Sequence, residues 1–241
     1  NLCMGFSQET ENGGIYEIGN GWINRRILRL ENSVYTTSLI NVVNGEEYIS
    51  EYLKEFELKI SREGTQIELG AADISFIGSS TPVWTDNTKQ LKFDFTCFVD
   101  GQEIGISLFY ETKSKEDVIY KWLQIDSLSG WFLDEVILEN MTFVSMAEGV
   151  EPVNSKIKTD SRFKYGVESD SIIEFWGCTE GLFALIADKT GSVKYTDEHE
   201  LVVKLNPEYP LDKGFTTSKA IIGAYRGQTD YGFVTYRNAK A

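Results

Sequence analysis

Apolar and polar residues alternate in short stretches along most of this sequence, a pattern typical of β-strands that have one buried face. In the clearest stretch, residues 91–99, every second position is apolar: Leu91, Phe93, Phe95, Cys97 and Val99. The dipeptide Asp100-Gly101 follows, and a second strand-like run covers residues 103–111. An Asp-Gly pair between two alternating runs is typical of a tight hairpin turn. We therefore predict an antiparallel β-hairpin over residues 91–111.

Similar runs cover most of the rest of the chain, and no segment keeps a helical period over a dozen residues. They lie at residues 22–30, 34–43, 55–60, 66–69, 74–77, 118–125, 134–144, 171–176, 182–187, 193–195, 201–205, 215–224 and 231–236. Many strands without interleaved helices predict an all-β protein of sandwich type, with two large antiparallel sheets stacked face to face. No linker divides these strands into two groups. We therefore assign residues 15–241 to one β-domain and residues 1–14 to an N-terminal tail.

The composition excludes several classes of function. Hydrophobic residues make up 41% of the 241 residues, which is enough for a folded core. The 23 basic and 37 acidic residues give a net charge of −14, which argues against binding to nucleic acid or to an anionic membrane surface. No run reaches the roughly 20 apolar residues that a membrane-spanning helix needs. Neutral sugars are compatible with this charge.

The cysteines and the N-terminus bear on cofactors and location. Cys3, Cys97 and Cys178 have no paired spacing and indicate neither a metal site nor a disulfide framework. Residues 1–8 are interpreted as the end of a signal peptide, so the tail is read as a signal-peptide remnant. The sequence therefore predicts a secreted, periplasmic or cell-surface protein with no metal and no cofactor.

One segment near the N-terminus, residues 16–49, specifies more than a meander of strands. Its characteristic residues are Ile18-Gly19-Asn20-Gly21, Arg25-Arg26, Thr36-Thr37-Ser38-Leu39, Asn41 and Gly45-Glu46-Glu47-Tyr48. Here the chain resembles the N-terminal β-supersandwich domain of family-36-type glycoside hydrolases, the α-galactosidase and α-N-acetylgalactosaminidase group of the galactose-mutarotase-like superfamily. The resemblance continues in order at Glu55-Phe56-Glu57-Leu58, Trp131-Phe132-Leu133-Asp134-Glu135-Val136 and Ala220-Ile221-Ile222-Gly223. It implies a two-sheet antiparallel supersandwich of the galactose-mutarotase-like type.

The resemblance carries over no catalytic residue. In the hydrolases that the chain resembles, both catalytic aspartates lie on a following (β/α)₈ barrel, and residues 1–241 contain no such barrel. Galactose mutarotases use a carboxylate base together with two histidines, whereas this chain has only His199, which lies among acidic residues in an expected surface turn. The Gly-x-Ser-x-Gly frame of a nucleophile elbow and a phosphate-binding glycine loop are also missing. Autonomous catalysis is therefore not expected.

Sugar recognition is the chemistry that remains. Sugar sites place aromatic rings against the apolar face of a pyranose, and polar side chains bind its hydroxyl groups. Trp84, in a polar loop, and Trp131, beside Gly130, are the main candidates because loops bring aromatic residues to the surface. The alternative for each is that the ring covers an edge of the core. The further candidates are Trp176, Arg162, Tyr225, Arg226 and Asp230, while Trp22 and Trp122 lie in mid-strand and are expected in the core.

Three functions are consistent with these residues. The first is a non-catalytic, carbohydrate-associated module that binds a neutral, galactose-type glycan and has a catalytic barrel domain or a second copy of the chain as its partner. The second is a structural or interface module without its own ligand, which a large exposed apolar patch on one sheet would favour. The third is a mutarotase-like enzyme acting on an unusual sugar, which requires a sheltered carboxylate pair or a buried His199.

Overall fold

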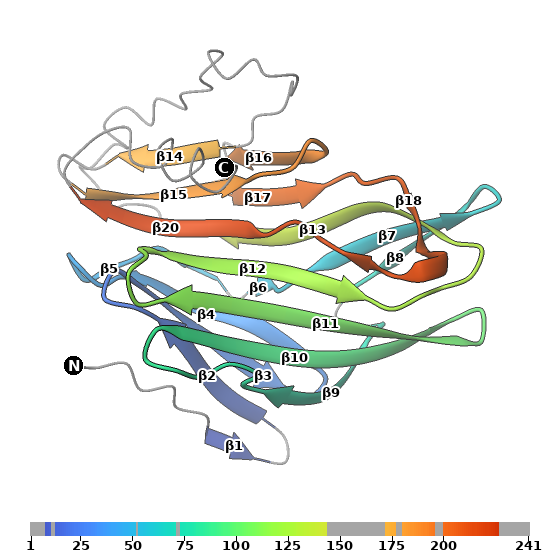
Figure 1. The fold of residues 1–241 in the computed structure, drawn as a ribbon, viewed down its shortest axis with the longest axis horizontal. Helices are drawn as coiled ribbons and strands as arrows, with labels where there is room; N and C mark the ends of the chain where they lie inside the picture. The colour runs from blue at the N-terminus through green and yellow to red at the C-terminus, as the bar shows by residue number, and fades with distance from the viewer. Residues whose placement is uncertain are drawn as a thin grey trace.

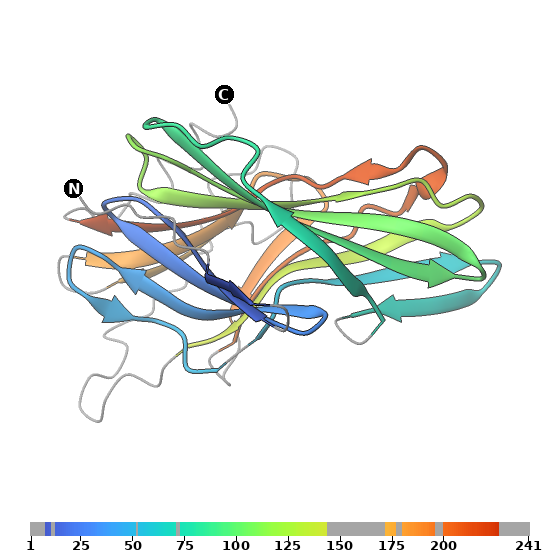
Figure 2. The same ribbon diagram turned by 90° about the horizontal axis from the view of Figure 1, so that it is seen from below.

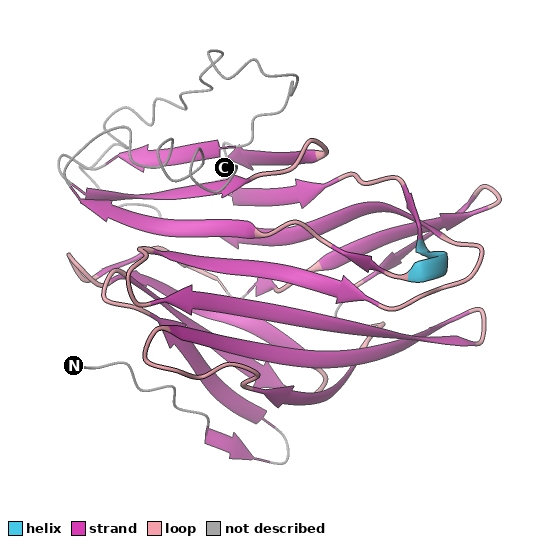
Figure 3. Cartoon of the chain, in the orientation of Figure 1, coloured by secondary structure: helices cyan, strands magenta, loops and turns pink. Residues whose placement is uncertain are grey.

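The computed structural model describes residues 8–10, 13–51, 53–70, 73–143, 172–176, 180–195 and 200–226. Most of this part of the chain is β-strand, and a single 3₁₀ turn, η2, covers Leu211–Lys213 (Figure 3). Among the described residues, no helix is long and apolar enough to cross a membrane. The predicted all-β fold is therefore confirmed.

The strands form three antiparallel sheets. The N-terminal sheet has the order β1 (Gln8–Thr10), β2 (Gly13–Gly19), β3 (Ile23–Leu30), β4 (Ser33–Asn41) and β5 (Glu46–Glu47), and β6 (Leu53–Lys54) also pairs with β4. The large sheet has the order β14 (Ile172–Trp176), β15 (Glu180–Ile186), β20 (Ala220–Arg226), β12 (Val118–Ile125), β11 (Gln102–Lys113), β10 (Thr88–Val99) and β9 (Ser75–Ser80), and β19 (Phe215–Thr216) pairs with β12. The third sheet has the order β16 (Gly191–Tyr195), β17 (Glu200–Leu205), β13 (Phe132–Thr142), β7 (Glu57–Arg62) and β8 (Thr65–Leu69), and β18 (Tyr209–Pro210) pairs with β13.

The three sheets make two layers. The large sheet forms one layer, and its strands cross the front of the molecule in Figure 1. The N-terminal and third sheets lie side by side in the other layer (Figure 2). These two sheets are joined by a bridge between Ile49 and Phe143 and by a hydrogen bond of 3.0 Å from the Ser50 amide to the Thr142 carbonyl. This arrangement is the predicted two-layer antiparallel supersandwich.

The predicted hairpin forms as expected from its alternation. Strands β10 and β11 pair without a break, with Leu91 opposite Tyr110 and Val99 opposite Gln102. Asp100 and Gly101 have φ values of 49° and 76°, the left-handed conformation that a two-residue hairpin turn requires at both positions. The hairpin prediction is therefore confirmed.

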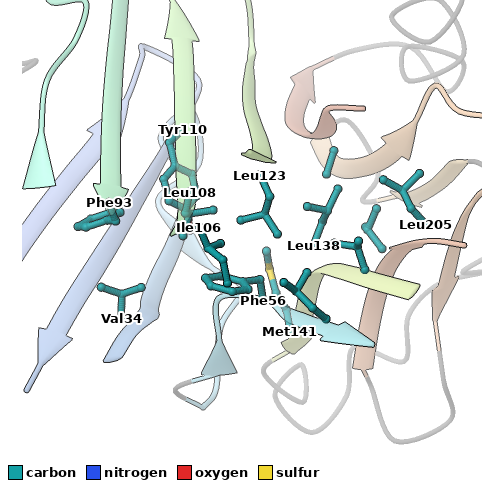
Figure 4. Close-up of a cluster of buried hydrophobic side chains, with 14 of the residues drawn as sticks. Val34, Phe56, Phe93, Ile106, Leu108, Tyr110, Leu123, Leu138, Met141 and Leu205 are labelled. Carbon is teal, nitrogen blue, oxygen red and sulfur yellow. The ribbon is translucent and has the colours of Figure 1, made fainter. Parts of the chain in front are cut away.

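The core fills the space between the two layers with the alternating apolar residues (Figure 4). Tyr16 of β2 packs edge-on against Phe93 of β10, with ring centroids 4.8 Å apart. Phe56, just before β7, packs against Phe95 in the same way at 5.5 Å. Aromatic pairs of this geometry join each sheet of one layer to the large sheet in the other.

The glycine-rich turn of the resembling segment is also fixed by long-range contacts. The buried Asn20 accepts hydrogen bonds from the amides of Trp22 and Ile23, at 2.9 and 3.0 Å. Its side-chain amide donates to Thr112 Oγ1 of the large sheet at 2.8 Å. A Cβ atom at Gly19 would lie only 2.6 Å from the Ile23 carbonyl oxygen, so this position needs glycine. The turn thus both closes the β2–β3 hairpin and ties it to the opposite layer.

Near the two ends of the chain, the observed strands and the predicted ones do not coincide fully. Residues 8–10 and 13–14, which the alternation leaves in the N-terminal tail, lie in β1 and β2, where Gln8 is opposite Ile15. The strand predicted at residues 231–236 lies outside the described residues.

Candidate functional site

The outer face of the third sheet is a ladder of alternating charges. Lys59 Nζ lies 3.3 Å from an oxygen of Glu68 and 3.1 Å from one of Glu135, and Lys204 also pairs with Glu135. Burial raises the pKa of Glu135, but hydrogen bonds from Lys204, Lys59 and Asn206 outweigh it and lower the pKa to about 2. This charged stretch is well suited to solvent, and its acids and bases are already paired with one another.

The outer face of the large sheet instead carries an aromatic row. Lys92 of β10 is opposite Phe109 of β11, which is opposite Trp122 of β12. The Phe109 and Trp122 rings are stacked, with centroids 4.9 Å apart and an interplanar angle of 2°. The ammonium groups of Lys219 and Lys92 lie 4.3 Å from the Trp122 centroid and 5.6 Å from the Phe109 centroid, respectively. The order of the strands therefore gives a continuous stack of cation, ring, ring and cation.

Polar residues flank the aromatic row on one side. Gln90 is opposite Glu111, which is opposite Tyr120. The Gln90 side-chain amide donates to Glu111 at 2.5 Å, and Lys219 Nζ donates to the other Glu111 oxygen at 3.0 Å. The Tyr120 hydroxyl donates to Glu116 at 2.8 Å.

A second polar line flanks the aromatic row on the other side. Asp94 is opposite Ser107, which is opposite Gln124, and Gln124 is opposite Thr216. The Ser107 hydroxyl donates to Asp94 at 2.6 Å. We call the aromatic row with its two polar lines the outer platform.

The outer platform is electrically balanced, although the chain carries a net charge of −14. Both of its lysines pair with an acid: Lys92 with Asp94 and Lys219 with Glu111. Burial raises the pKa of Glu111, but hydrogen bonds from Gln90 and Lys219 outweigh it and lower the pKa. Burial and the hydrogen bond to Glu116 raise the pKa of Tyr120. Glu111 is therefore an ionised acceptor and Tyr120 a neutral hydroxyl, which suits hydrogen bonding rather than proton transfer.

A second group of charged residues lies between the layers. Arg25 of β3 binds both carboxylate oxygens of Glu139 of β13, at 2.6 and 2.9 Å, and Glu55 at 3.0 Å. Lys121 of β12 binds Glu55 at 2.8 Å and Glu139 at 3.1 Å. These four residues form the buried charge cluster, which contacts all three sheets. Their side chains are at most 2% exposed, so the cluster is closed to ligands and is a structural feature.

Two hydroxyl groups complete the hydrogen bonding of this cluster. Thr36 Oγ1 accepts from Arg25 Nε at 2.6 Å and donates to Glu55 at 2.5 Å, and the Tyr110 hydroxyl also donates to Glu55. Burial would raise the pKa of Glu55, but Lys121, Arg25 and the hydrogen bonds together lower it to about 2. Burial and the neighbouring carboxylates raise the pKa of Tyr110. Both glutamates are paired twice, so the cluster offers no free acid or base.

The depressed pKa of Glu55 predicts acid sensitivity. A carboxyl group whose pKa falls on folding contributes stability above its ordinary pKa of 4.5, and this stability is lost as the pH falls from there towards 2. We expect Glu55 to contribute about 3 kcal/mol to the fall in the free energy of unfolding over this range. Urea unfolding of the wild type and of Glu55→Gln at pH 7, 5, 4, 3 and 2 measures this loss. Parallel pH profiles for the two proteins would contradict this assignment.

Of the predicted site residues, Trp84 lies at the surface with 40% of its area exposed. It forms a bridge with Lys89, whose Nζ lies 5.3 Å from the ring centroid. Alternation along β10 puts Lys89 on the opposite side of the strand from Gln90 and Lys92. Trp84 is therefore not part of the outer platform.

The expected surface position of Trp131 is wrong, because this residue is only 1% exposed. The Arg62 guanidinium lies over its ring at 4.7 Å from the centroid. Its carbonyl accepts a hydrogen bond of 2.8 Å from the amide of Leu211, and its amide approaches the Leu128 carbonyl. The η2 turn thus closes over Trp131. The ring fills an edge of the core, which was the alternative interpretation of this residue.

Most of the remaining candidates lie outside the residues, or have side chains outside the part, that the structure describes. Trp176 is opposite Gly181, which is opposite Tyr225, so the backbones of two predicted residues lie in one row of the large sheet. Arg226 is opposite Glu180. The side chains of Trp176, Tyr225 and Arg226, and the whole of Arg162, Asp230 and His199, lie outside the described residues.

The expectation that Trp22 and Trp122 lie in the core is also wrong. Trp22 is 37% exposed beside the Gly21 turn. Trp122 lies between the buried residues Lys121 and Leu123, so alternation directs it outward. This alternation could have shown from the sequence that Trp122 faces outward, because the residues on either side of it, Lys121 and Leu123, occupy core positions.

Comparisons with known proteins agree with the fold. No protein-family model matches the sequence, and no curated protein matches it. Among solved structures, an α-mannosidase from Enterococcus faecalis V583 superposes with a TM-score of 0.54 and 8% identity over 92% of this chain and 30% of its own. A galactose mutarotase related enzyme from Lactobacillus acidophilus gives 0.53 and 8% identity over 89% of this chain and 98% of its own. A family-36 α-galactosidase from Geobacillus stearothermophilus gives 0.50 and 9% identity over 93% and 42%.

These likenesses confirm the galactose-mutarotase-like supersandwich fold that the resemblance implied. The chain spans less than half of the α-mannosidase and of the α-galactosidase, so it corresponds to one part of each. It spans nearly all of the mutarotase-related enzyme. The fold therefore occurs both alone and within larger glycoside hydrolases.

Proposed function

We propose that this chain is a carbohydrate-binding module and that the outer platform is its ligand site. The observation that supports this most is the stacked pair of Phe109 and Trp122 between two lines of hydrogen-bonding side chains. Aromatic rings pack against the C–H groups of a pyranose, while carboxylate, amide and hydroxyl groups bind its hydroxyls. The platform offers both kinds of contact on the outer face of the large sheet.

The charge balance of the platform supports a neutral ligand. Lys92 and Lys219 are each neutralised by an adjacent carboxylate, so no unpaired cation is left in these two pairs to attract a sulfated or uronic glycan. Binding should therefore depend little on salt. We propose a neutral glycan of galactose type, since the solved structures with this fold include an α-galactosidase and a galactose mutarotase related enzyme.

A catalytic domain is the partner that we propose for the module. The chain corresponds to 30% and 42% of two larger glycosidases, which is the arrangement expected of an accessory domain. A module that binds polymeric sugars would act outside the cytoplasm, so we propose a secreted, periplasmic or cell-surface location.

An interface role is a second candidate, which one observation favours. On the outer face of the N-terminal sheet, Ile15 is opposite Leu28, which is opposite Tyr35. Ile15 and the nearby Leu30 are 43% and 48% exposed. Replacing Ile15 and Leu30 by lysine separates the two roles, because an interface variant loses assembly, measured by sedimentation, but keeps sugar binding.

A glycan array followed by calorimetry tests the proposed function. We expect Trp122→Ala to weaken binding of a neutral glycan about 10-fold or more, because it removes one ring of the stack. The matched control is Phe98→Ala, since Phe98 is 69% exposed at the far end of β10, and we expect it to leave binding unchanged. Equal binding by the wild type and Trp122→Ala, or no binding to any neutral glycan, would refute the platform as the site.

A further inference from the structure

We infer that the outer platform binds an internal stretch of a linear neutral glycan that straddles the ring pair, and not a single terminal sugar. This inference rests on the proposed function and concerns the class of ligand. Its starting point is the geometry of the aromatic row.

The two rings of the row each have one face left for a sugar. Phe109 and Trp122 are stacked on each other, so neither ring can bind a sugar on its inner face. Their outer faces point in opposite directions along the row, towards Lys92 and Lys219. The platform therefore has two stacking positions, one on each side of the ring pair.

Flexible lysines occupy both stacking positions, and a sugar can displace them. The side chains of Lys92 and Lys219 are 27% and 42% exposed, so each can turn towards solvent. Their ammonium groups already pair with Asp94 and Glu111, at 2.8 and 3.0 Å. A bound sugar requires each lysine to leave the ring face while its ammonium group stays beside its carboxylate partner.

The separation of the two positions sets the length of the ligand. Neighbouring strands lie about 4.8 Å apart, so the row from β10 across β11 and β12 to Lys219 extends about 14 Å. One sugar cannot reach both outer faces. A chain of at least three units can, with its end units stacked on Phe109 and Trp122 and its middle unit over the ring edges.

The polar lines fit such a chain along its whole length. Asp94, Ser107 and Gln124 run beside the aromatic row on one side. Gln90 lies beside it on the other side, next to Glu111, which is buried and already accepts from Gln90 and Lys219. Hydroxyl groups along one edge of an extended glycan would therefore find partners at each unit, whereas a terminal sugar would use only one end of this line.

A length series tests this inference by calorimetry. The probes are linear neutral oligosaccharides of one, two, three and four units in the galactose, glucose and mannose series. Filling a second position with a linked sugar raises affinity without new contacts elsewhere, so we expect about a 10-fold or larger rise between the disaccharide and the longer chains. We expect Phe109→Ala, which removes one position, to abolish this rise while the short sugars still bind at Trp122.

The outcomes separate this inference from the proposed function. Equal affinity for all lengths in the wild type would overturn the straddling chain and leave the carbohydrate-binding function in place. An unchanged length dependence in Phe109→Ala would also overturn it. Absence of binding by every probe would overturn both, and Phe98→Ala serves again as the control for an exposed aromatic residue on the same strand.

Discussion

Replacing Arg25 by methionine is expected to lower the free energy of unfolding by about 3–5 kcal/mol. Methionine fills much of the same volume but removes every partner that Arg25 gives to Glu139 and Glu55. Both carboxylates would then stay buried with Lys121 as the one remaining cation of the cluster. An uncompensated buried charge is far more costly than a lost surface pair. Urea denaturation at pH 7 measures the effect.

The adjacent residue provides the matched control for this change. Arg26 is on the same strand, but its side chain is 50% exposed and pairs with Glu17 in solvent. Arg26→Met should therefore cost less than about 1 kcal/mol. Similar losses for the two variants would show that the buried charge cluster does not hold the three sheets together.

The double variant Arg25→Met with Glu139→Met sharpens the same test. Removing both partners takes away the unpaired charge that each single variant leaves. We therefore expect the double variant to lose less free energy of unfolding than the two single variants lose in sum.

Replacing Trp131 by alanine is expected to lower the free energy of unfolding by about 3–5 kcal/mol. The ring is 1% exposed, and its removal would leave a cavity under the η2 turn and remove the surface on which Arg62 rests. The indole Nε1 has no hydrogen-bond partner in the described part of the chain, so packing is the main contribution of this residue. Thermal and urea unfolding measure the loss.

Trp84→Ala is the control for this second change, because the Trp84 ring is 40% exposed. We expect it to change stability by less than about 1 kcal/mol. At a temperature where Trp131→Ala is folded, we expect the Trp131→Ala variant to bind glycans like the wild type. Selective loss of binding in folded Trp131→Ala would instead restore the sequence-based assignment of this residue to the ligand site.

Local patterns predicted the strands because alternation is a property of each segment by itself. The β10–β11 hairpin followed from residues 91–111 alone, since the turn and both strands are contiguous. The two-layer fold followed from the number of such segments and from the lack of a helical period.

The buried charge cluster was missed, although two of its members carried a signal. Arg25 shares its alternation with the buried residues Ile23 and Ile27, and Lys121 shares it with Ile119 and Leu123. A charged residue at a core position needs a buried partner. Which carboxylates supply that partner depends on how β3, β12 and β13 pack, and no local pattern contains this information.

The outer platform was missed for a related reason. Phe109, Trp122 and Lys219 come together only when the register of neighbouring strands is known. Trp131 was misplaced because a loop aromatic residue was expected at the surface, whereas the distant η2 turn covers it. Both errors concern contacts between segments that lie far apart in the sequence.

The most direct test of the outer platform is a spectroscopic titration of the five tryptophans in the chain. In ¹⁵N-labelled protein, each indole N–H gives one NMR signal. Replacing the tryptophans one at a time by phenylalanine assigns these signals. The titrant is the linear neutral tetrasaccharide that binds most tightly in the length series. We predict that the Trp122 signal moves and saturates with the binding curve, while the Trp131 and Trp84 signals stay in place. An unmoved Trp122 signal at saturation, or a shift confined to Trp84, would contradict the platform as the sugar site.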